Sequence, residues 1–440
     1  MGLLEAIFDG GVVGAGGAGF PTHKKLVPGT SLLIVNAVEC EPLLASDRYV
    51  MRHYSDNVIS ALIRLGQELE IPRVVIGIKR TYLDEIASLR TAIAKTGAVI
   101  EIYEVDSFYP AGDEQILIHE ITGQTVPPGQ IPLALGIVVL NVTTVYTIAC
   151  ALEGQPVTRR LVTVNAEVNH PVIVDAPVGV MPADLISAAG GTNLTDYRIV
   201  RGGPMMGRKY QRDAVFGYGK ADGGLLVLPP ANPVISLNDK PMERVISEAR
   251  SICIQCSICT ELCPRYLVGH QMRPHRVMRA VATQCNPTDL TDALLCCECG
   301  VCELFACPMG LSPRQMNILV KRQLREAGVG IADTEVHLDH TSGRPYRRIA
   351  QSRFIERLGL GGYPNHLNDY VSIEPDSVRI PTRHGVGKPS TPVVGVGDVV
   401  ACGQVIAEVA REDVGCLVHA SIEGRVTQVS ADEICIERRG

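Results

Sequence analysis

Two cysteine runs decide the fold of this chain: Cys253-x2-Cys256-x2-Cys259-x3-Cys263-Pro264 and, further along, Cys296-Cys297-x-Cys299-x2-Cys302-x4-Cys307-Pro308. Within each run, three closely spaced cysteines can bring their sulfur atoms to one point in a short loop. The last cysteine precedes a proline, which favours the start of a helix that leads away from that point. This spacing predicts iron–sulfur clusters.

The ligand sets follow from the crossed pattern of four-iron ferredoxins, in which the cysteine before the proline binds the other cluster. We therefore predict two [4Fe–4S] clusters. The ligands of the first are Cys253, Cys256, Cys259 and Cys307. The ligands of the second are Cys263, Cys296, Cys299 and Cys302. Cys297 competes with Cys296 for one place, and the x2 gap before Cys299 favours Cys296.

A zinc site or a set of disulfides would account less well for these cysteines. A structural zinc site uses four ligands, often as two separated C-x2-C pairs. A disulfide framework requires an oxidising compartment. Neither predicts two triplets that each end in Cys-Pro, although the x4 gap before Cys307 makes the second run less regular than the first.

Composition narrows the class of protein. The 440 residues allow roughly two to four domains. The formal net charge is −6 and no Lys/Arg cluster lies on a plausible recognition helix, so we expect no nucleic-acid partner. Fifteen cysteines without a secretory signal indicate a reducing compartment, and we expect a cytoplasmic protein. The uncharged segment 131–152 contains Pro132 and Gly136, which favour a strand and a helix over a membrane span.

A glycine-rich loop, Gly10-Gly11-Val12-Val13-Gly14-Ala15-Gly16-Gly17-Ala18-Gly19-Phe20-Pro21, lies near the N-terminus. It contains G-x-G-x-x-G, but a helix is expected before it and Pro21 follows it, so we do not predict an ordinary Rossmann turn. Uncovered backbone N–H groups in such a loop can approach a phosphate or a flat ring closely. The alternative is a merely flexible loop.

Strands and helices alternate after this loop. Strands are expected at 31–36, 73–78, 99–105 and 135–141, and helices at 3–9, 56–70, 81–96 and 144–152. This alternation predicts a mainly parallel sheet. The polar stretch 36–42 follows the first strand, at the edge where α/β sheets bind ligands. Asp113 and Glu114 open a further helix, where carboxylates are also favoured for purely structural reasons.

The rest of the chain differs in kind. A small β-rich module with strands and one helix is expected before the cysteines, and His270 and His275 are interpreted as residues on a helix surface. Residues 331–369 are predicted to be a polar connector. We divide the chain into 1–157, 158–235, 236–330 and 331–440.

Several motifs follow the order found in a known family: Gly-Gly-Ala-Gly-Phe-Pro-Thr at 16–22, Asn-x3-Cys-Glu-Pro at 36–42, Tyr-Pro-Ala-Gly-Asp-Glu at 109–114, Val-Pro-Pro-Gly at 126–129, and Arg-Gly-Gly-Pro-Met-Met-Gly at 201–207. They resemble the flavin- and NADH-binding subunit of respiratory complex I and, more closely, the RnfC protein of the Rnf complex, over roughly residues 8–325. The resemblance implies a multidomain α/β protein. Its expected parts are an FMN/NADH-binding domain, a β-grasp module and a ferredoxin-like domain with two clusters.

The C-terminal part resembles a barrel-sandwich hybrid of the lipoyl- and biotinyl-carrier type. A carrier needs a lysine at its hairpin tip, and the tip expected near Arg411–Asp413 has none. We therefore interpret this module as a docking or structural domain. Because the FMN and cluster motifs lie upstream, we expect them to function without the residues after Glu374.

The same resemblance implies the residues of the flavin site. Those expected to contact the FMN phosphate and ring are Gly16, Gly17, Gly19 and Lys25. Those expected to line the flavin pocket are Asn36, Glu39, Asp113, Glu114 and Asn141. Those expected on the nicotinamide side are Phe20 and Glu41. Lys25 could instead be a solvated lysine, and Ala15 stands where complex I has an arginine, which removes a charge contact to phosphate or NADH.

Hydride donors give up two electrons and clusters carry one, whereas flavin can do both. The order NADH, FMN, two [4Fe–4S] clusters and acceptor is therefore chemically sensible. The domain order resembles that of the cobalamin reductases of propanediol-utilising bacterial microcompartments, which implies reduction of cobalamin for a B12-dependent diol dehydratase. The alternatives are an RnfC-type protein in a membrane ion pump and an electron-transfer adaptor without flavin. Cobalamin or a cobalamin-handling enzyme, and a microcompartment shell protein, are the expected partners.

Overall fold

The N-terminal part folds around a parallel sheet with the strand order β3-β2-β1-β5. The strands are β1 (Leu32–Ala37), β2 (Val74–Lys79), β3 (Glu101–Val105) and β5 (Ile137–Asn141). The buried, largely aliphatic sequences of β1, β2 and β5 suit strands covered on both faces, whereas β3 at the edge of the sheet is mostly exposed. The structure is a computed structural model that describes residues 2–236, 240–283, 290–331 and 341–438.

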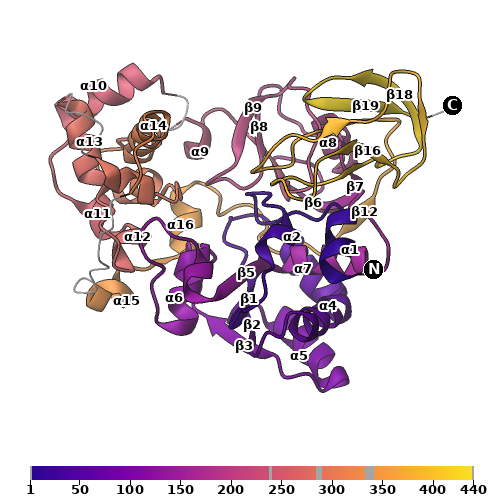
Figure 1. Cartoon of the computed structure of the whole chain (residues 1–440). Helices are drawn as coiled ribbons and strands as arrows, with labels where there is room; N and C mark the ends of the chain where they lie inside the picture. Colours follow the sequence, from indigo (N-terminus) through magenta and orange to yellow (C-terminus); the bar gives the residue numbers. More distant parts are fainter. Residues whose placement is uncertain (1, 237–239, 284–289, 332–340, 439–440) are drawn as a thin grey trace.

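Helices cover both faces of this sheet (Figure 1). Alternate residues of β1 enter different cores, so that Leu33 and Val35 pack with one set of helices and Ile34 packs on the opposite face. The first set comprises α1 (Leu3–Asp9), α3 (Ser46–His53), α4 (Ser55–Glu68), α5 (Leu83–Thr96) and α7 (Val142–Leu152). Helix α6 (Glu114–Thr122) covers the other face. The predicted parallel α/β domain is therefore confirmed.

A six-stranded sheet with the order β12-β7-β6-β10-β8-β9 follows. Its strands are β6 (Arg159–Ala166), β7 (Val172–Pro177), β8 (Arg198–Arg201), β9 (Arg208–Gln211), β10 (Gly224–Leu228) and β12 (Tyr370–Ser372). Helix α8 (Pro182–Ala188) packs against this sheet. Strand β12 comes from much later in the chain and pairs in parallel with β7. The β-rich module is thus completed by the C-terminal part.

The cysteine domain is a group of short helices beside the α/β domain (Figure 1). Its main helices are α10 (Met242–Ile252), α11 (Ile258–Glu261), α12 (Pro264–Leu267), α13 (Pro274–Ala282) and α14 (Pro313–Glu326). Helix α12 begins directly after Cys263 and has a proline as its first residue. A proline suits that position because the first helical N–H has no partner within the helix.

The polar connector predicted at 331–369 is wrong for its second half. Strand β11 (Ile349–Ala350) pairs with β4 (Phe108–Tyr109) of the α/β domain, and helix α16 (Gln351–Arg357) follows. Phe354 is fully buried and stacks on Tyr109 with ring centroids 4.6 Å apart. The apolar residues of this segment therefore form a core between the modules. Residues 332–340 lie outside the described part.

The C-terminal residues form two small antiparallel sheets. One has the order β13-β19-β18-β15 and the other β14-β16-β17. Their strands are β13 (Ser377–Pro381), β14 (Thr391–Pro392), β15 (Val399–Val400), β16 (Val405–Glu408), β17 (Val418–His419), β18 (Gly424–Val429) and β19 (Glu433–Glu437). Residues 411–413 form the turn between β16 and β17, as predicted. This sandwich lies over α1 and α2 (Thr22–Lys25) (Figure 1). No helix of the described residues is long and apolar enough to cross a membrane.

Candidate flavin and iron–sulfur site

The glycine-rich loop leaves one side open. It is closed by a bridge between Val13 and Pro21, with α1 before it and α2 after it, so it is not a Rossmann turn. Gly17 has φ +100°, and a Cβ placed there would have no protein atom within 4 Å. Gly16 and Gly17 are exposed, whereas Phe20 is half-buried. An open, side-chain-free backbone of this kind fits a flat ring or a phosphate.

Gly19 differs from the other two predicted loop glycines. It has φ +63° and is buried, and a Cβ built on it would lie 1.9 Å from the carbonyl oxygen of His384 in the C-terminal sandwich. Gly19 therefore faces protein. The side of Gly19 where a side chain would stand is covered by the sandwich. Its predicted contact with FMN would therefore have to be made by its backbone N–H or carbonyl group.

Two carboxyl groups, those of Asp47 and Glu39, lie close together beneath the loop. Asn141 and Thr143, at the start of α7, donate hydrogen bonds of 2.6 Å each to the two oxygens of Asp47. Burial, and then the charge of Asp47, raise the pKa of Glu39 to about 8. Glu39 thus keeps its proton at neutral pH and can donate a hydrogen bond to Asp47. Two of the predicted pocket residues, Glu39 and Asn141, meet here.

Arg160 brings a positive charge to the same cluster. It comes from β6, is 5% exposed, and donates to the carbonyl oxygen of Ala15 at 3.2 Å. The N–H of Ala15 donates to Thr144 Oγ1 at 2.8 Å. Ala15, which stands where complex I has an arginine, is therefore held by an arginine of the next module, Arg160. Asp47, Thr143 and Arg160 were missed from the sequence, because their roles depend on contacts between segments distant in the chain.

The other predicted site residues contact one another or nearby backbone groups. Lys25 Nζ forms an ion pair with Glu114 at 2.8 Å, which links α2 to α6. Asn36 donates to the carbonyl oxygen of Gly112 at 2.8 Å. Asp113 is the N-cap of α6 and accepts from the N–H groups of Gln115 and Ile116. The structure therefore brings the ends of β1, α2 and α6 to one edge of the sheet.

Glu41 joins the sheet edge to the β-grasp module. Its two carboxylate oxygens accept hydrogen bonds from the backbone N–H groups of Met205, at 2.9 Å, and Met206, at 3.0 Å. Burial raises the pKa of Glu41 to about 7, and the two N–H donors oppose that rise. Its predicted position on the nicotinamide side remains a prediction, since these contacts give it a structural role.

The first cysteine group surrounds one cavity. That cavity is lined by Cys253, Cys256, Cys259 and Cys307, together with His275 and Met278. Burial, and then the neighbouring thiols, Cys307 first, raise the pKa of Cys259 to about 12. Thiols gathered this closely in apolar surroundings form a donor set that suits an iron–sulfur cluster.

The second group consists of the remaining predicted ligands. Cys263 lies beside Cys296 and Cys297, and Cys302 lies beside Cys296 and Cys263. Cys263 of the first run thus lies beside cysteines of the second run, and Cys307 beside those of the first, while Cys302 also lies beside Cys259. The crossed ligand sets stay a prediction with which these positions agree. Among the described residues, no three His, Cys, Asp or Glu side chains converge on a single metal ion. A four-iron cube holds its thiolates further apart than one zinc ion does.

Two side chains connect the second cysteine group to the flavin domain. The hydroxyl group of Tyr109 donates to the carbonyl oxygen of Cys299 at 2.8 Å, in the interior. Arg265 donates to Asp113 at 2.9 Å and lies beside Cys297. Burial alone would lower the pKa of Arg265, but Asp113 and Cys297 together raise it. Cys297 therefore lies between the second cysteine group and the flavin domain, beside both Cys299 and Arg265.

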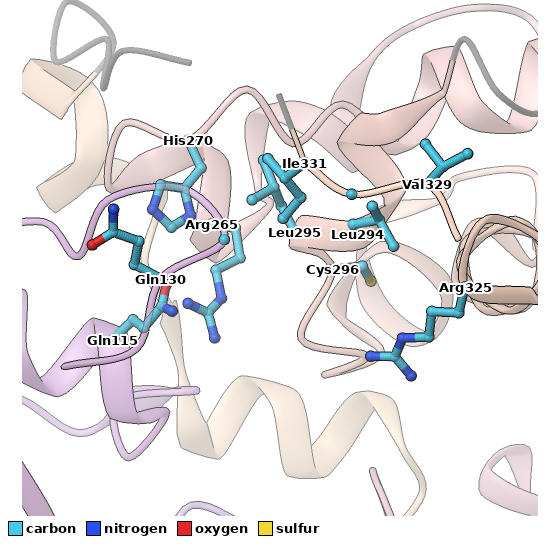
Figure 2. A pocket seen from close by; sticks show the side chains of 12 residues that line it. Gln115, Gln130, Arg265, His270, Leu294, Leu295, Cys296, Arg325, Val329 and Ile331 are labelled. Carbon is cyan, nitrogen blue, oxygen red and sulfur yellow. The ribbon is translucent and has the colours of Figure 1, made fainter. Parts of the chain in front are cut away.

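A cavity of about 400 Å³ opens between α6 and the cysteine domain. Figure 2 shows that Gln115 and Gln130 lie on its α/β side, while Cys296 and Arg325 lie across from them. His270 also lines it. This histidine was predicted to lie on a helix surface, which is wrong: it is 2% exposed, in the loop between α12 and α13, and hydrogen-bonds to the carbonyl oxygen of Val126. Local sequence did not reveal this contact because Val126 belongs to another domain.

Family comparisons agree with the modules seen in the structure. The Nuo51 FMN-binding domain matches residues 7–150, and the SLBB domain matches 161–209. The 4Fe-4S dicluster domain matches 252–312, and the RnfC barrel sandwich hybrid domain matches 370–438. The chain thus contains an FMN-binding domain and a 4Fe–4S dicluster domain. The open loop and the gathered thiols described above fit these groups.

Similar proteins extend the comparison to the whole chain. An NAD+-reducing [NiFe]-hydrogenase in the H2-reduced state has a TM-score of 0.51 and 22% identity, covering 75% of this chain and 63% of that chain, which shows a common fold. The RnfC-type protein of the ion-translocating oxidoreductase complex of Vibrio cholerae is 33% identical over 66% of this chain and 36% of its own length. The cobalamin reductases PduS of Citrobacter freundii and Salmonella typhimurium are each 37% identical over 99% of this chain and 96% of their own length. The chain belongs to the PduS cobalamin reductase family.

Proposed function

We propose that this protein is an NADH-dependent reductase that passes electrons through FMN and two [4Fe–4S] clusters to cobalamin. The observation that carries the proposal is similarity to cobalamin reductases along the whole chain, including the C-terminal sandwich. When bound, FMN supplies the exchange between a two-electron donor and one-electron carriers. The protein has to hold these groups in order and keep water from the path between them.

The residues around the two cysteine groups indicate the order in which electrons pass through them. The second group lies next to the flavin domain, because Tyr109 contacts Cys299, and Arg265 lies beside Cys297 and pairs with Asp113. The first group lies nearer the surface, where Cys256 is exposed and Ile254 beside it is 63% exposed. We therefore assign electron entry to the second group and exit to the first. An exposed apolar rim suits the brief, small contacts of electron-transfer partners.

Two carboxyl groups of the flavin pocket differ in charge: Glu39 is protonated and Asp47 is ionised. Protonated Glu39 shares its hydrogen bond with Asp47, which is also held by Asn141. Arg160 balances the remaining negative charge beneath the loop. This arrangement would keep the loop backbone fixed while the charge of a bound ring changes.

The alternative function is that of an RnfC-type protein, which feeds electrons into a membrane complex. It is supported by the similarity to the Vibrio cholerae protein over 66% of this chain. The cobalamin reductases match nearly all of both chains, whereas the RnfC-type protein matches over little more than a third of its own length, so we favour the reductase. Recruitment to a microcompartment, through a shell protein, is part of the same proposal.

The test is anaerobic reduction of hydroxocobalamin by NADH with the purified protein. We expect the cobalamin spectrum to change first to the cob(II) form and then towards cob(I). The matched control is the same protein stripped of FMN, which should oxidise no NADH. A protein that reduces an artificial dye with NADH but leaves cobalamin unchanged, and that co-purifies with membrane proteins, would favour the RnfC-type alternative.

A further inference from the structure

The C-terminal sandwich packs directly on the glycine-rich loop. The N–H of Val386 donates to the carbonyl oxygen of Ala18 at 2.9 Å. A Cβ built on Gly385, which has φ +130°, would lie 2.4 Å from the oxygen of Ala18 and 2.5 Å from the Cα of Gly19. The two backbones therefore touch without room for a side chain on either. Residues more than 360 positions apart form one surface.

A buried lysine joins three modules at the root of the loop. Lys220, from the β-grasp module, is 2% exposed. Its Nζ donates to the carbonyl oxygens of Gly11, at 2.9 Å, and Leu417, at 2.7 Å. Its own N–H donates to His384 Nδ1 at 3.2 Å. Burying an ammonium group is costly unless it is hydrogen-bonded, so this lysine ties Gly11 to the sandwich.

The sandwich also contacts both flanks of the loop. The backbone of Asp9, at the end of α1, lies close to His419, which is 3% exposed. Arg411, at the hairpin tip, lies beside the buried ring of His23 of α2. The hairpin tip, which carries the cofactor-bearing lysine in lipoyl domains, thus lies here against the helix after the loop.

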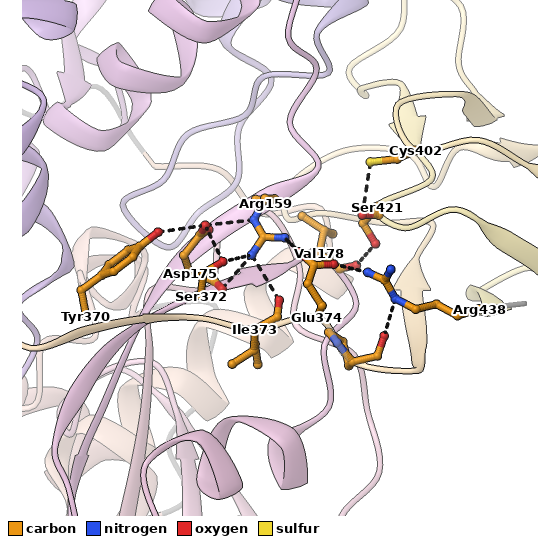
Figure 3. A network of polar contacts seen from close by, with 11 residues as sticks. Arg159, Asp175, Val178, Tyr370, Ser372, Ile373, Glu374, Cys402, Ser421 and Arg438 are labelled. Atoms are coloured by element: carbon orange, nitrogen blue, oxygen red, sulfur yellow. Dashed lines mark hydrogen bonds and ion pairs between the residues drawn. The ribbon is translucent and has the colours of Figure 1, made fainter. Parts of the chain in front are cut away.

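A second set of contacts anchors the sandwich to the β-grasp module. Figure 3 shows Arg159 between Asp175 and Glu374, with Nε 3.0 Å from Asp175 Oδ2 and Nη1 2.5 Å from Glu374 Oε1. Arg438 also pairs with Glu374. The hydroxyl group of Ser421 donates to the carbonyl oxygen of Val178 at 2.5 Å in the interior. The sandwich is therefore held on two sides, and its contact with the loop is not that of a freely moving domain.

We propose that the C-terminal sandwich is part of the flavin site: it holds residues 14–19 in the conformation that accepts FMN, with Gly385 and Lys220 as positioning residues. This inference rests on the FMN-binding domain and not on cobalamin as the acceptor. It corrects our expectation that the FMN site would function without the residues after Glu374, which was based on chain order alone. Chain order does not reveal a contact between residues 18 and 386.

The first test compares two glycine substitutions within the sandwich. Gly385→Ala places a methyl group against the loop backbone, whereas Gly387→Ala places one 2.4 Å from the oxygen of Val414, within the sandwich itself. Both positions have positive φ, so the local strain is similar. We expect Gly385→Ala to weaken FMN binding by about tenfold or more, and Gly387→Ala to change it little. FMN affinity is measured by quenching of flavin fluorescence, with iron content as the measure of an intact cysteine domain.

The second test needs no substitution. If the sandwich favours FMN binding, then by linkage FMN must favour docking of the sandwich. Hydrogen exchange of the Val386 amide, and of the peptide around it, should therefore slow when FMN is added to the FMN-free protein. The Ile436 amide in the sandwich core should not change.

Two results would overturn the proposal. One is equal FMN affinity, and an unchanged circular dichroism band of the bound flavin, in Gly385→Ala and in the unaltered protein. The other is exchange at Val386 that is the same with and without FMN. If Gly385→Ala does not fold, Lys220→Met replaces it: this variant keeps the aliphatic stem, loses both Nζ hydrogen bonds, and should also weaken FMN binding while iron content is retained.

Discussion

Tyr109→Phe tests the link between the flavin domain and the second cysteine group. The substitution removes one hydroxyl group and keeps the ring that stacks on Phe354. That hydroxyl group donates to the carbonyl oxygen of Cys299 at 2.8 Å, and Tyr109 and Cys299 are 3% and 8% exposed. No cavity of note is created, so the effect is that of one buried carbonyl left without its donor.

The expected magnitude follows from that single loss. A buried polar group without a partner costs about 1–3 kcal/mol. Since a tenfold change in an equilibrium constant corresponds to about 1.4 kcal/mol, local opening around Cys299 should become about 5- to 150-fold more frequent. A chain with several domains does not unfold in one step, so a single melting temperature would not report this. Hydrogen exchange of the peptides that cover residues 296–307, and the rate of iron release to a chelator, are the suitable measurements.

Tyr103→Phe is the matched control. The hydroxyl group of Tyr103 donates to the carbonyl oxygen of Glu120 at 2.7 Å, a bond of nearly the same length between the same kinds of atoms. Tyr103 is 38% exposed, so water can replace the lost donor and the cost should stay below about 0.5 kcal/mol. Equal exchange at 296–307 in the two variants would refute the reasoning, because Tyr109→Phe would then have no effect on the segment that contains Cys299.

Three further predictions concern the cofactors and pH. Cys263→Ala should remove about four of eight iron atoms, and electron paramagnetic resonance should lose the cluster of the second run rather than that of the first, because ligation crosses. Gly17→Val should lose FMN and keep iron, because a branched residue at φ +100° is strained and its side chain would point into the open side of the loop; flavin released on denaturation measures this. Glu39 has its pKa raised from 4.5 to about 8, so its contribution to stability is present below pH 4.5 and lost as the pH rises through 8. Glu39→Gln should therefore gain stability over the unaltered protein on going from pH 5 to pH 9, and the difference in hydrogen exchange between the two proteins around residues 36–47, measured at each pH, would reveal this.

The sequence was a good guide to local structure. The buried runs of β1 and β2, and the 3.6-residue pattern of α4, predicted those elements to within one or two residues. Cys263-Pro264 correctly placed the start of α12, because proline suits the first turn of a helix. These features depend on neighbouring residues, and neighbouring residues are what a single sequence displays.

Contacts between modules were not predictable in the same way. Asp47 lies in a helix whose pattern alone does not distinguish it, and it belongs to the site only because Asn141 and Thr143 approach it from α7. Histidine is a residue type that is common on surfaces, yet His270 is covered by the α/β domain and hydrogen-bonds to Val126. Phe354 lies in a segment of polar composition and completes the core around Tyr109. In each case the partner is distant in the chain, so that no local pattern could identify it.

The contact between the sandwich and the loop also explains how the same module can sit at opposite ends of related chains. The resemblance to the RnfC protein of the Rnf complex implies that in that protein the barrel-sandwich module precedes the flavin domain. Here the module follows the cysteine domain, and yet it lies against α1 and the loop that α1 introduces (Figure 1). A module joined just before α1 and one joined after β12 could both reach this position, since the end of α1 and the sandwich are in contact. The place of the module in the chain can therefore change while its contact with the flavin loop is kept. This is expected if the flavin site requires that contact and does not depend on which end of the chain the module is joined to.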